Sequence, residues 1–277
     1  MDRMSSFGTR EIKRLVPQRY AHRVTLSRDP KSIPTGDKGV EGERNDQLIS
    51  GDFRSRYEHL SRYSEASKNK WGTVIDIGSG TGYGAALLSE MNWVVGIDLS
   101  REALRYARSN YPGPETIQGS ASSIPLADEC ADAITAFEVI EHLEEPDKLV
   151  EECHRVLKRD GLLFVSSPNP AHIGNMVRKA LLQVPIPKKV DLGNLYHLRE
   201  FTYAEMQGIL SAGGFEIMSA RGQTLPVDHI VPGVDLLLKR VAGLLRIEDV
   251  YRWLLSDLGG RFPSLSYTVV YIAIRVR

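Results

Sequence analysis

Short apolar segments alternate with amphipathic segments through the middle of this 277-residue chain. Apart from the more polar segment 115–120, the apolar segments are rich in Val, Ile, Leu or Ala, and most of them end in Gly, Ser or Pro, which predicts buried strands. They occupy residues 73–78, 94–100, 115–120, 131–138 and 162–170. Segments of helical composition or periodicity occupy residues 53–68, 82–91, 101–110 and 147–161, with Ser100 as a predicted N-cap and Gly161 as a predicted stop. This alternation predicts a parallel sheet with helices on both faces.

The pattern changes after residue 170. Residues 201–217 predict one more helix and strand, and the alternation at 266–276 predicts a last, antiparallel strand inserted beside the fifth. Residues 171–200 and 225–258 interrupt this order, and we expect them to cap the sheet as helical insertions. The expected fold class is therefore α/β, a doubly wound, Rossmann-like, seven-stranded mixed sheet with cap insertions.

Two parts of the chain lie outside the alternation of strands and helices. Residues 1–52 are polar and loop-rich, and we expect an arm in front of one domain that covers 53–277. The second insertion carries an apolar stripe at helical spacing. Its members are Leu237, Leu238, Val241, Leu244 and Leu245. Three roles fit the stripe: packing on the sheet as core, an apolar lid over the substrate, or contact with a membrane surface.

The overall charge is balanced, with 35 basic and 35 acidic residues, but its distribution is uneven. Residues 76–160 contain 7 basic and 16 acidic residues, which indicates a site built from carboxylates and argues against an extended nucleic-acid surface. Two cysteines, Cys130 and Cys153, form neither a disulfide framework nor a zinc-ligand set. Because no apolar run resembles a signal peptide or a membrane span, we expect a cytoplasmic protein.

A glycine-rich loop follows the first predicted strand. Gly78 and Gly80 precede a helix, and such glycines let the backbone turn and let a ligand approach the free N–H groups. The loop alone also fits a dinucleotide. Asp76 lies near the end of the first predicted strand, where its negative charge suits an ammonium group better than a pyrophosphate. Asp98 ends the second strand, where it can accept hydrogen bonds from a ribose diol.

In these segments the chain resembles the class I S-adenosylmethionine (SAM)-dependent methyltransferases of the small-molecule O-methyltransferase type. The similar stretches follow one another in family order across roughly residues 53–217. The resemblance implies that SAM is the cofactor, and it assigns a role to each matching position. Gly78 and Gly80 line the methionine part, Asp98 binds the ribose, Leu99 packs on adenine, Ser120, Ala121 and Ser122 meet the adenine edge, Phe137 faces the cofactor, and Tyr63 closes over its carboxylate. The family often has Asp where this chain has Ser120, which replaces a charged contact to adenine by a hydroxyl.

The stretch FEVIEHL, residues 137–143, places three polar side chains at the end of the fourth predicted strand. Three hypotheses fit Glu138, Glu141 and His142. Similar E-x-x-E-H stretches in ubiquinone-pathway and small-RNA terminal 2′-O-methyltransferases hold a divalent ion, and His197 is placed to join them here; magnesium, manganese or zinc would suit the set. Alternatively, His142 acts as a general base without metal. In the third hypothesis, the acidic residues only open a helix.

The sequence therefore predicts a SAM-dependent methyltransferase that acts on a hydroxyl or amine of a small-molecule substrate, with His142 and Glu138 as catalytic candidates. A metal-dependent terminal RNA 2′-O-methyltransferase and a non-catalytic SAM-binding subunit are the alternatives, and a nicotinamide oxidoreductase is a further one. Balanced charge and the lack of a basic face argue against RNA.

Overall fold

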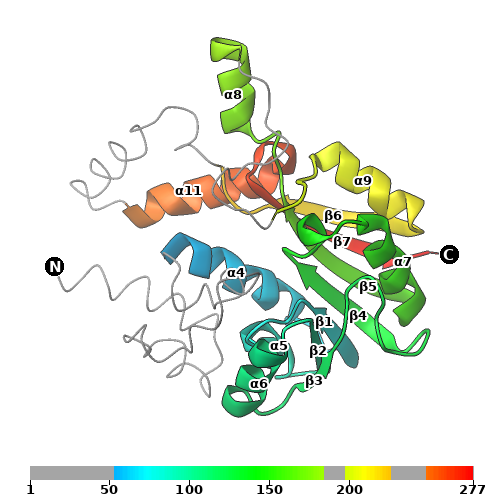
Figure 1. Cartoon of the computed structure of the whole chain (residues 1–277). Helices are drawn as coiled ribbons and strands as arrows, with labels where there is room; N and C mark the ends of the chain where they lie inside the picture. Colours follow the sequence, from blue (N-terminus) through cyan, green and yellow to red (C-terminus); the bar gives the residue numbers. More distant parts are fainter. Residues whose placement is uncertain (1–52, 184–196, 226–247, 277) are drawn as a thin grey trace. The chain divides into compact units, whose positions relative to one another are not determined.

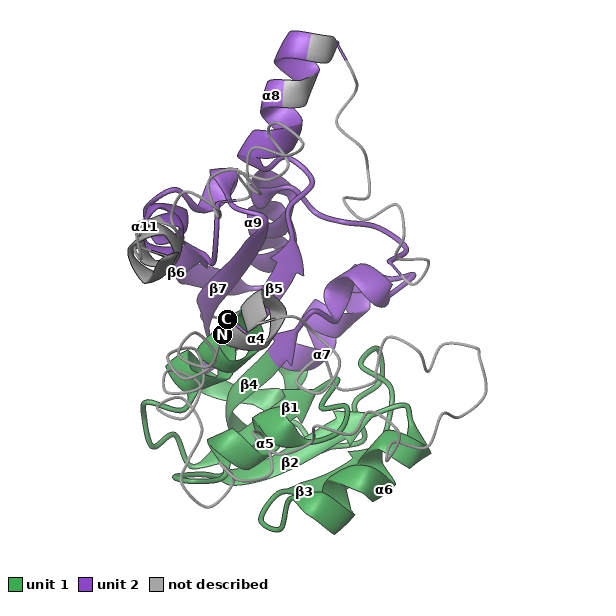
Figure 2. Cartoon of the chain, turned by 90° about the vertical axis from the view of Figure 1, so that its left-hand side faces the viewer, with its two compact units in different colours: residues 1–135, 155–161 green, residues 136–154, 162–277 purple. Residues whose placement is uncertain are grey.

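The computed structural model describes residues 53–183, 197–225 and 248–276 of the chain (Figure 1). The predicted arm at 1–52 and the apolar stripe at 237–245 lie outside the described residues. The chain divides into two compact units (Figure 2). Unit 1 comprises residues 1–135 and 155–161, and unit 2 comprises residues 136–154 and 162–277.

The strands form the seven-stranded mixed sheet that the sequence predicts, in the order β3-β2-β1-β4-β5-β7-β6. Their bounds are Thr73–Ile77 (β1), Trp93–Asp98 (β2), Glu115–Gln118 (β3), Ala131–Phe137 (β4), Leu157–Pro168 (β5), Phe215–Gly222 (β6) and Thr268–Arg275 (β7). β7 pairs antiparallel with both β5 and β6, which confirms the predicted inserted strand. The fold class is therefore the expected one.

Helices occupy most of the remaining described residues. The α-helices are Phe53–Ala66 (α4), Tyr83–Leu88 (α5), Arg101–Asn110 (α6), Pro146–Val156 (α7), Ile173–Leu182 (α8), Tyr203–Ala212 (α9) and Glu248–Arg261 (α11). Short 3-10 turns cover Ile140–His142 (η2) and Pro263–Leu265 (η4). None of the helices in the described ranges is long and apolar enough to cross a membrane.

In unit 1, β1 pairs with β2 and β2 with β3, all parallel. Apart from its first residue, β1 is completely buried, as expected for a strand covered by helices on both faces. Ser100 caps α6 as predicted, because its side chain accepts a hydrogen bond from the Ala103 N–H at 3.2 Å. The cap fixes where the chain turns from β2 into the helix.

In unit 2, the chain enters α9 through a capping box. The Thr202 hydroxyl accepts from the backbone N–H of Glu205, and the Glu205 carboxylate accepts from the backbone N–H of Thr202. Phe201, immediately before the cap, is fully buried. Residue 213, where α9 ends, must be a glycine, since a Cβ there would lie 2.3 Å from Val150 Cγ1 of α7.

The predicted helix at 147–161 is too long. α7 ends at Val156, and β5 already begins at Leu157. A continuing helix would need the carbonyls of Arg155 and Val156 for its own next turn. Those carbonyls accept instead from the backbone N–H groups of Glu129 and Cys130, so the chain leaves the helix there.

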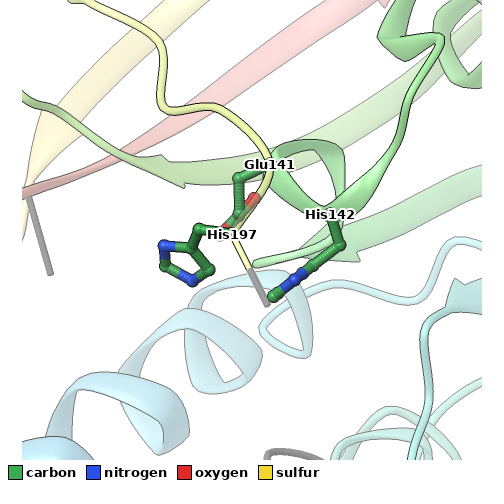
Figure 3. Close-up of side chains that lie close together, drawn as sticks. All are labelled: Glu141, His142 and His197. Atoms are coloured by element: carbon green, nitrogen blue, oxygen red, sulfur yellow. The ribbon is translucent and has the colours of Figure 1, made fainter. Parts of the chain in front are cut away.

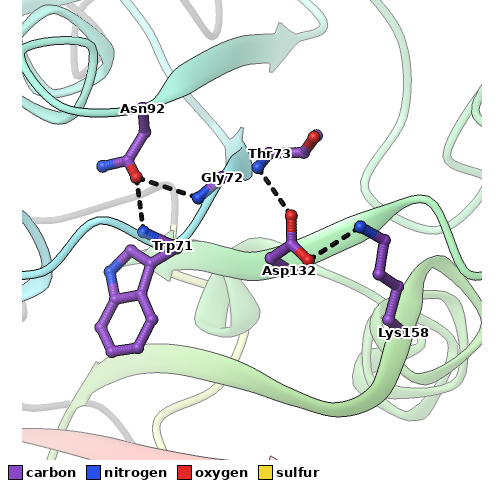
Figure 4. A network of polar contacts seen from close by, with 6 residues as sticks. All are labelled: Trp71, Gly72, Thr73, Asn92, Asp132 and Lys158. Carbon is purple, nitrogen blue, oxygen red and sulfur yellow. Dashed lines mark hydrogen bonds and ion pairs between the residues drawn. The ribbon is translucent and has the colours of Figure 1, made fainter.

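Asp132 joins three segments of unit 1 at the start of β4 (Figure 4). One carboxylate oxygen accepts from the Thr73 N–H at 2.8 Å, and the other accepts from Lys158 Nζ at 2.8 Å. Nearby, the Asn92 side-chain oxygen accepts from the Trp71 N–H at 2.7 Å. Burial opposes the charged form of Asp132, but the hydrogen bonds from Lys158 and Thr73 outweigh it and hold the pKa of the carboxyl below its ordinary value.

We expect Asp132→Ala to lower the free energy of unfolding by about 1–2 kcal/mol, because a backbone donor of β1 loses its partner. The stabilisation should be present above the ordinary pKa of aspartate and disappear as the pH falls below it. Urea unfolding of both proteins at neutral and acidic pH measures this. Asp128→Ala is the control, since its ion pair with Arg155 is exposed and should contribute at most about 0.5 kcal/mol. Equal effects of the two substitutions would contradict the role of Asp132.

Candidate functional site

The glycine loop between β1 and α5 leaves room for a ligand. Gly78, Gly80 and Gly82 all have positive φ angles, of 69°, 52° and 86°. A Cβ at Gly82 would lie 2.5 Å from Ala107 Cβ, so that glycine is needed for packing on α6. A Cβ at Gly80 would meet nothing within 4 Å among the described residues. Gly80 is therefore the place where a ligand can approach the backbone closely.

Asp98, at the end of β2, fastens this loop. One oxygen of its carboxylate accepts from the Gly80 N–H at 2.9 Å, and the other accepts from the Ser100 N–H at 2.7 Å. The carboxylate is buried. Because each carboxylate oxygen has two lone pairs, both bonds leave acceptor capacity for the hydroxyls of a ribose. Asp98 thus both shapes the loop and offers the charge expected of a ribose ligand.

Asp76 is the second-to-last residue of β1 and is completely buried. Its carboxylate accepts from Thr135 Oγ1 at 2.7 Å and from the Tyr63 hydroxyl at 3.1 Å. Burial raises the pKa of the Asp76 carboxyl to about 7, although the hydrogen bonds from Thr135 and Tyr63 oppose this rise. A cationic group of a ligand would stabilise the ionised form, which agrees with the expected ammonium contact.

Tyr63 is part of this buried group. Its ring packs on the chain at Gly84, where a Cβ would lie 2.1 Å from Tyr63 Cζ. Burial raises the pKa of its hydroxyl, so Tyr63 donates a hydrogen bond at physiological pH. The sequence singled out Tyr63 for the cofactor carboxylate, whereas the structure pairs its hydroxyl with Asp76.

The third loop, after β3, is held by its own hydroxyl. Ser120 Oγ accepts from the Ser122 N–H at 3.2 Å, and Ala121 between them is buried. Leu99 is 52% exposed, which leaves an apolar side chain available to pack on a flat ring. Phe137, in unit 2, is buried at the end of β4. The positions expected for the adenine are thus an exposed leucine and a small, tightly turned loop.

A second group of functional side chains lies within unit 2 (Figure 3). Glu141, His142 and His197 each offer one ligand atom, and these atoms lie within 4.8 Å of one another. The two imidazole rings stand edge to face with centroids 4.8 Å apart. Glu141 and His197 are buried, and His142 is half-buried. The predicted partnership of His197 with the E-x-x-E-H stretch is therefore present in the geometry.

Glu138 does not join this group. It has a positive φ of 55°, before the 3-10 turn at Ile140–His142 begins, so the expected single helical face does not form. Its carboxylate accepts from Ser166 Oγ at 2.9 Å, and its N–H donates to the same hydroxyl at 3.2 Å. Three of the four predicted ligands thus come together, and the fourth bonds to β5.

Two residues of these groups were missed from the sequence. Thr135 follows the strand alternation and carries no other signal that it would reach Asp76. Glu200 lies 3.0 Å from His197, between carboxylate oxygen and Nδ1, and both are buried. Its spacing of three residues from a predicted ligand was the available signal.

Comparison with known proteins identifies the same class of protein as the sequence motifs, the SAM-dependent methyltransferases. A model of the methyltransferase domain family matches residues 75–165. The chain is 29% identical over 195 residues to a probable S-adenosylmethionine-dependent methyltransferase of Mycolicibacterium smegmatis, covering 70% of this chain and 69% of that one. It is 32% identical over 230 residues to a malonyl-[acyl-carrier protein] O-methyltransferase of Laribacter hongkongensis, covering 72% and 73% of the two chains.

A solved structure has the same fold. It is a complex of the Haloferax volcanii Trm112 methyltransferase activator with a methyltransferase, with a TM-score of 0.56, 16% identity, and coverage of 84% of this chain and 96% of that one. The family model and the two relatives show that the chain belongs to the S-adenosylmethionine-dependent methyltransferases and is an enzyme of that family. The cofactor of this family is SAM. It fits the open space at Gly80, the carboxylate of Asp98 that holds the glycine loop, and the buried carboxylate of Asp76.

We expect Gly80→Val to abolish measurable SAM binding, because the new side chain fills the ligand space and strains a positive φ. Asp98→Asn should weaken binding by about 2 kcal/mol, roughly 30-fold, through the lost charge. Calorimetric titration with SAM measures both. The control is Gly208→Ala in α9, where a Cβ also meets nothing within 4 Å among the described residues. Unchanged affinity in both test variants would contradict the cofactor assignment.

The affinity for SAM should depend on pH through Asp76. An ammonium group binds the ionised carboxylate, so affinity should rise as the pH increases through about 7 and fall below it. Asp76→Asn should lower the affinity and remove this dependence. Tyr63→Phe removes a hydrogen bond that favours the ionised form, so it should move the midpoint to higher pH. Calorimetry between about pH 6 and 7.5, below the ordinary α-amino pKa of about 8, isolates the carboxyl. A flat profile for the wild type would exclude Asp76 as the titrating ligand.

Proposed function

We propose that this enzyme transfers a methyl group from SAM to a hydroxyl, or an amine, of a small-molecule substrate. The observation that supports an oxygen acceptor is the group of Glu141, His142 and His197, which can bind an ion or accept a proton. The Laribacter hongkongensis relative is, by its name, an O-methyltransferase, which favours oxygen as well. The residues around Asp76, Gly80 and Asp98 bind the cofactor in this proposal.

The work left to the protein is modest. When bound, SAM supplies a methyl group that is already activated on a sulfonium. The chain then has to exclude water, align the acceptor and remove its proton. In the proposal, Gly78, Gly80, Asp76 and Asp98 bind the methionine and ribose parts, and Leu99, Ser120, Ala121 and Ser122 contact the adenine. Phe137 faces the cofactor, and Tyr63 supports Asp76.

We propose that Glu141, His142 and His197 hold a divalent ion. One carboxylate and two imidazoles, within reach of one another, are a ligand set that suits manganese or zinc better than magnesium, which prefers oxygen ligands. When bound, such an ion supplies positive charge that orients a hydroxyl and lowers its pKa. Glu138 lies outside this set, and in the proposal it makes a polar contact with the substrate.

A metal-free version of the proposal gives His142 the role of general base. Its imidazole is half-buried, so it is open to an acceptor, and histidine is the side chain that most often serves as a general base. His142 then takes the proton of the acceptor. The two versions differ in one property, which is whether removal of divalent ions stops the reaction.

Substrate choice is proposed to reside in the insertions at 171–200 and 225–258, within a domain at 53–277. The cofactor residues account for the first strands of the sheet, so selectivity has to come from other segments. α8, the described helix of the first insertion, exposes Met176 and Leu181, which suits an apolar part of a substrate.

Chelation distinguishes the two versions. The enzyme is incubated with SAM that carries a deuterated methyl group and with a metabolite extract, and labelled products are identified by mass spectrometry. If an ion is required, EDTA should abolish labelling and Mn²⁺ should restore it, whereas Glu141→Ala should resist rescue. Glu144→Ala is the control, because Glu144 is exposed and outside the group. Full labelling after exhaustive chelation would leave His142 as the base, tested by the pH profile of His142→Ala.

The same labelling experiment, with RNA added to the extract, tests the acceptor. Label in the small-molecule fraction agrees with the proposal. Label confined to the ends of added RNA would establish the terminal RNA alternative instead. Tight SAM binding without label in any fraction would point to a non-catalytic role and contradict the proposal.

A further inference from the structure

We infer that Glu200 is a positioning residue, which fixes the imidazole of His197 so that its Nε2 faces Glu141 and His142. The inference rests on the proposed ion-binding role of these three residues and adds a fourth, which does not touch the ion. It follows from two independent constraints on the segment 197–200, one through side chains and one through the backbone.

The side-chain constraint is a buried pair. Glu200 is 3% exposed, and its carboxylate oxygen lies 3.0 Å from His197 Nδ1. A buried carboxylate is costly unless a hydrogen-bond donor compensates it. His197 Nδ1 lies within hydrogen-bond distance of this carboxylate and can donate to it when it carries the ring proton. The proton on Nδ1 leaves Nε2 as the acceptor, which is the form of imidazole that binds a metal.

The backbone constraint ties the same segment to Glu141. The N–H groups of Leu198 and Arg199 both donate to the carbonyl oxygen of Glu141, at 2.9 and 3.2 Å. His197 is thus placed beside Glu141 by bonds that involve neither of their side chains. The remaining freedom of His197 is the rotation of its ring and the position of its proton, and Glu200 restricts both.

The neighbouring residues hold this segment at its other end. The Arg199 guanidinium lies over the Phe201 ring, 4.8 Å from its centroid, and pairs with Glu205 at 3.1 Å. Glu205 also closes the capping box of α9. Glu200 and Glu205 therefore lie in the same short stretch with different tasks: Glu200 is buried against an imidazole, whereas Glu205 stabilises the start of a helix.

This contrast provides the test. Mn²⁺ affinity is measured by calorimetry for the wild type, Glu200→Gln, Glu200→Ala, His197→Asn and the control Glu205→Gln. The tautomer of His197 is read from ¹⁵N NMR of the metal-free protein, with His197→Asn as the reference spectrum. Removal of an outer partner of a metal-bound histidine typically lowers affinity about 10–100-fold. We expect a loss in this range for Glu200→Ala, a smaller loss for Glu200→Gln, and a shift of the His197 proton from Nδ1 toward Nε2 in Glu200→Ala.

Thermal unfolding and SAM affinity are measured on each variant to separate positioning from folding. If Glu200→Ala does not fold, the isosteric Glu200→Gln decides the matter. Wild type that binds no Mn²⁺, or binds it as well as His197→Asn does, overturns both the ion-binding proposal and the role of Glu200. Wild type that binds Mn²⁺ while the Glu200 variants match it in affinity and tautomer overturns the positioning role alone. If Glu205→Gln lowered the Mn²⁺ affinity as much as the Glu200 variants do, the positioning role would also be overturned. Loosening the segment 197–205 would then be enough to explain the loss.

Discussion

The buried carboxylate of Asp76 is the constraint on which the proposed cofactor site in unit 1 depends. A carboxylate without solvent is unfavourable, and its pKa of about 7 expresses that cost. The protein keeps it by aiming two hydroxyl donors at it, from Thr135 of β4 and Tyr63 of α4. Three segments that are distant in sequence are thereby fixed around the start of the glycine loop. In the proposed binding mode, the ammonium group of SAM adds the positive charge that these two neutral donors do not supply.

The candidate ion-binding group of unit 2 is organised by backbone hydrogen bonds. The carbonyl of Glu141 accepts from Leu198 and Arg199, which sets the segment around His197 against the 3-10 turn of FEVIEHL. Because these bonds do not involve the functional side chains, the carboxylate and imidazoles can face one another without having to hold the chain in place. Such separation of scaffold from ligand is what a preorganised site requires.

Much of this could be predicted from the sequence because local rules decide it. Short apolar runs, most of them ending in Gly, Ser or Pro, located the strands, and Ser100 was recognisable as a cap from its place before a helical stretch. The predictions that failed concern positions that are fixed by residues distant in the sequence. α7 ends at Val156 since Glu129 and Cys130 take the carbonyls that would extend it. Periodicity within 147–161 contains no information about those partners.

The same limit explains the outcome at the candidate site. Helical spacing in FEVIEHL suggested one face for Glu138, Glu141 and His142, but Ser166 draws Glu138 to β5 and leaves the other two with His197. For Glu200, the spacing of three residues from His197 was the one available signal, and it was not sufficient because an acidic residue beside an arginine in a polar stretch is usually exposed. Its burial against His197 distinguishes it from Glu205. Residue type and spacing therefore identify which side chains can do chemistry, whereas burial and the choice of hydrogen-bond partner decide which of them are placed to do it.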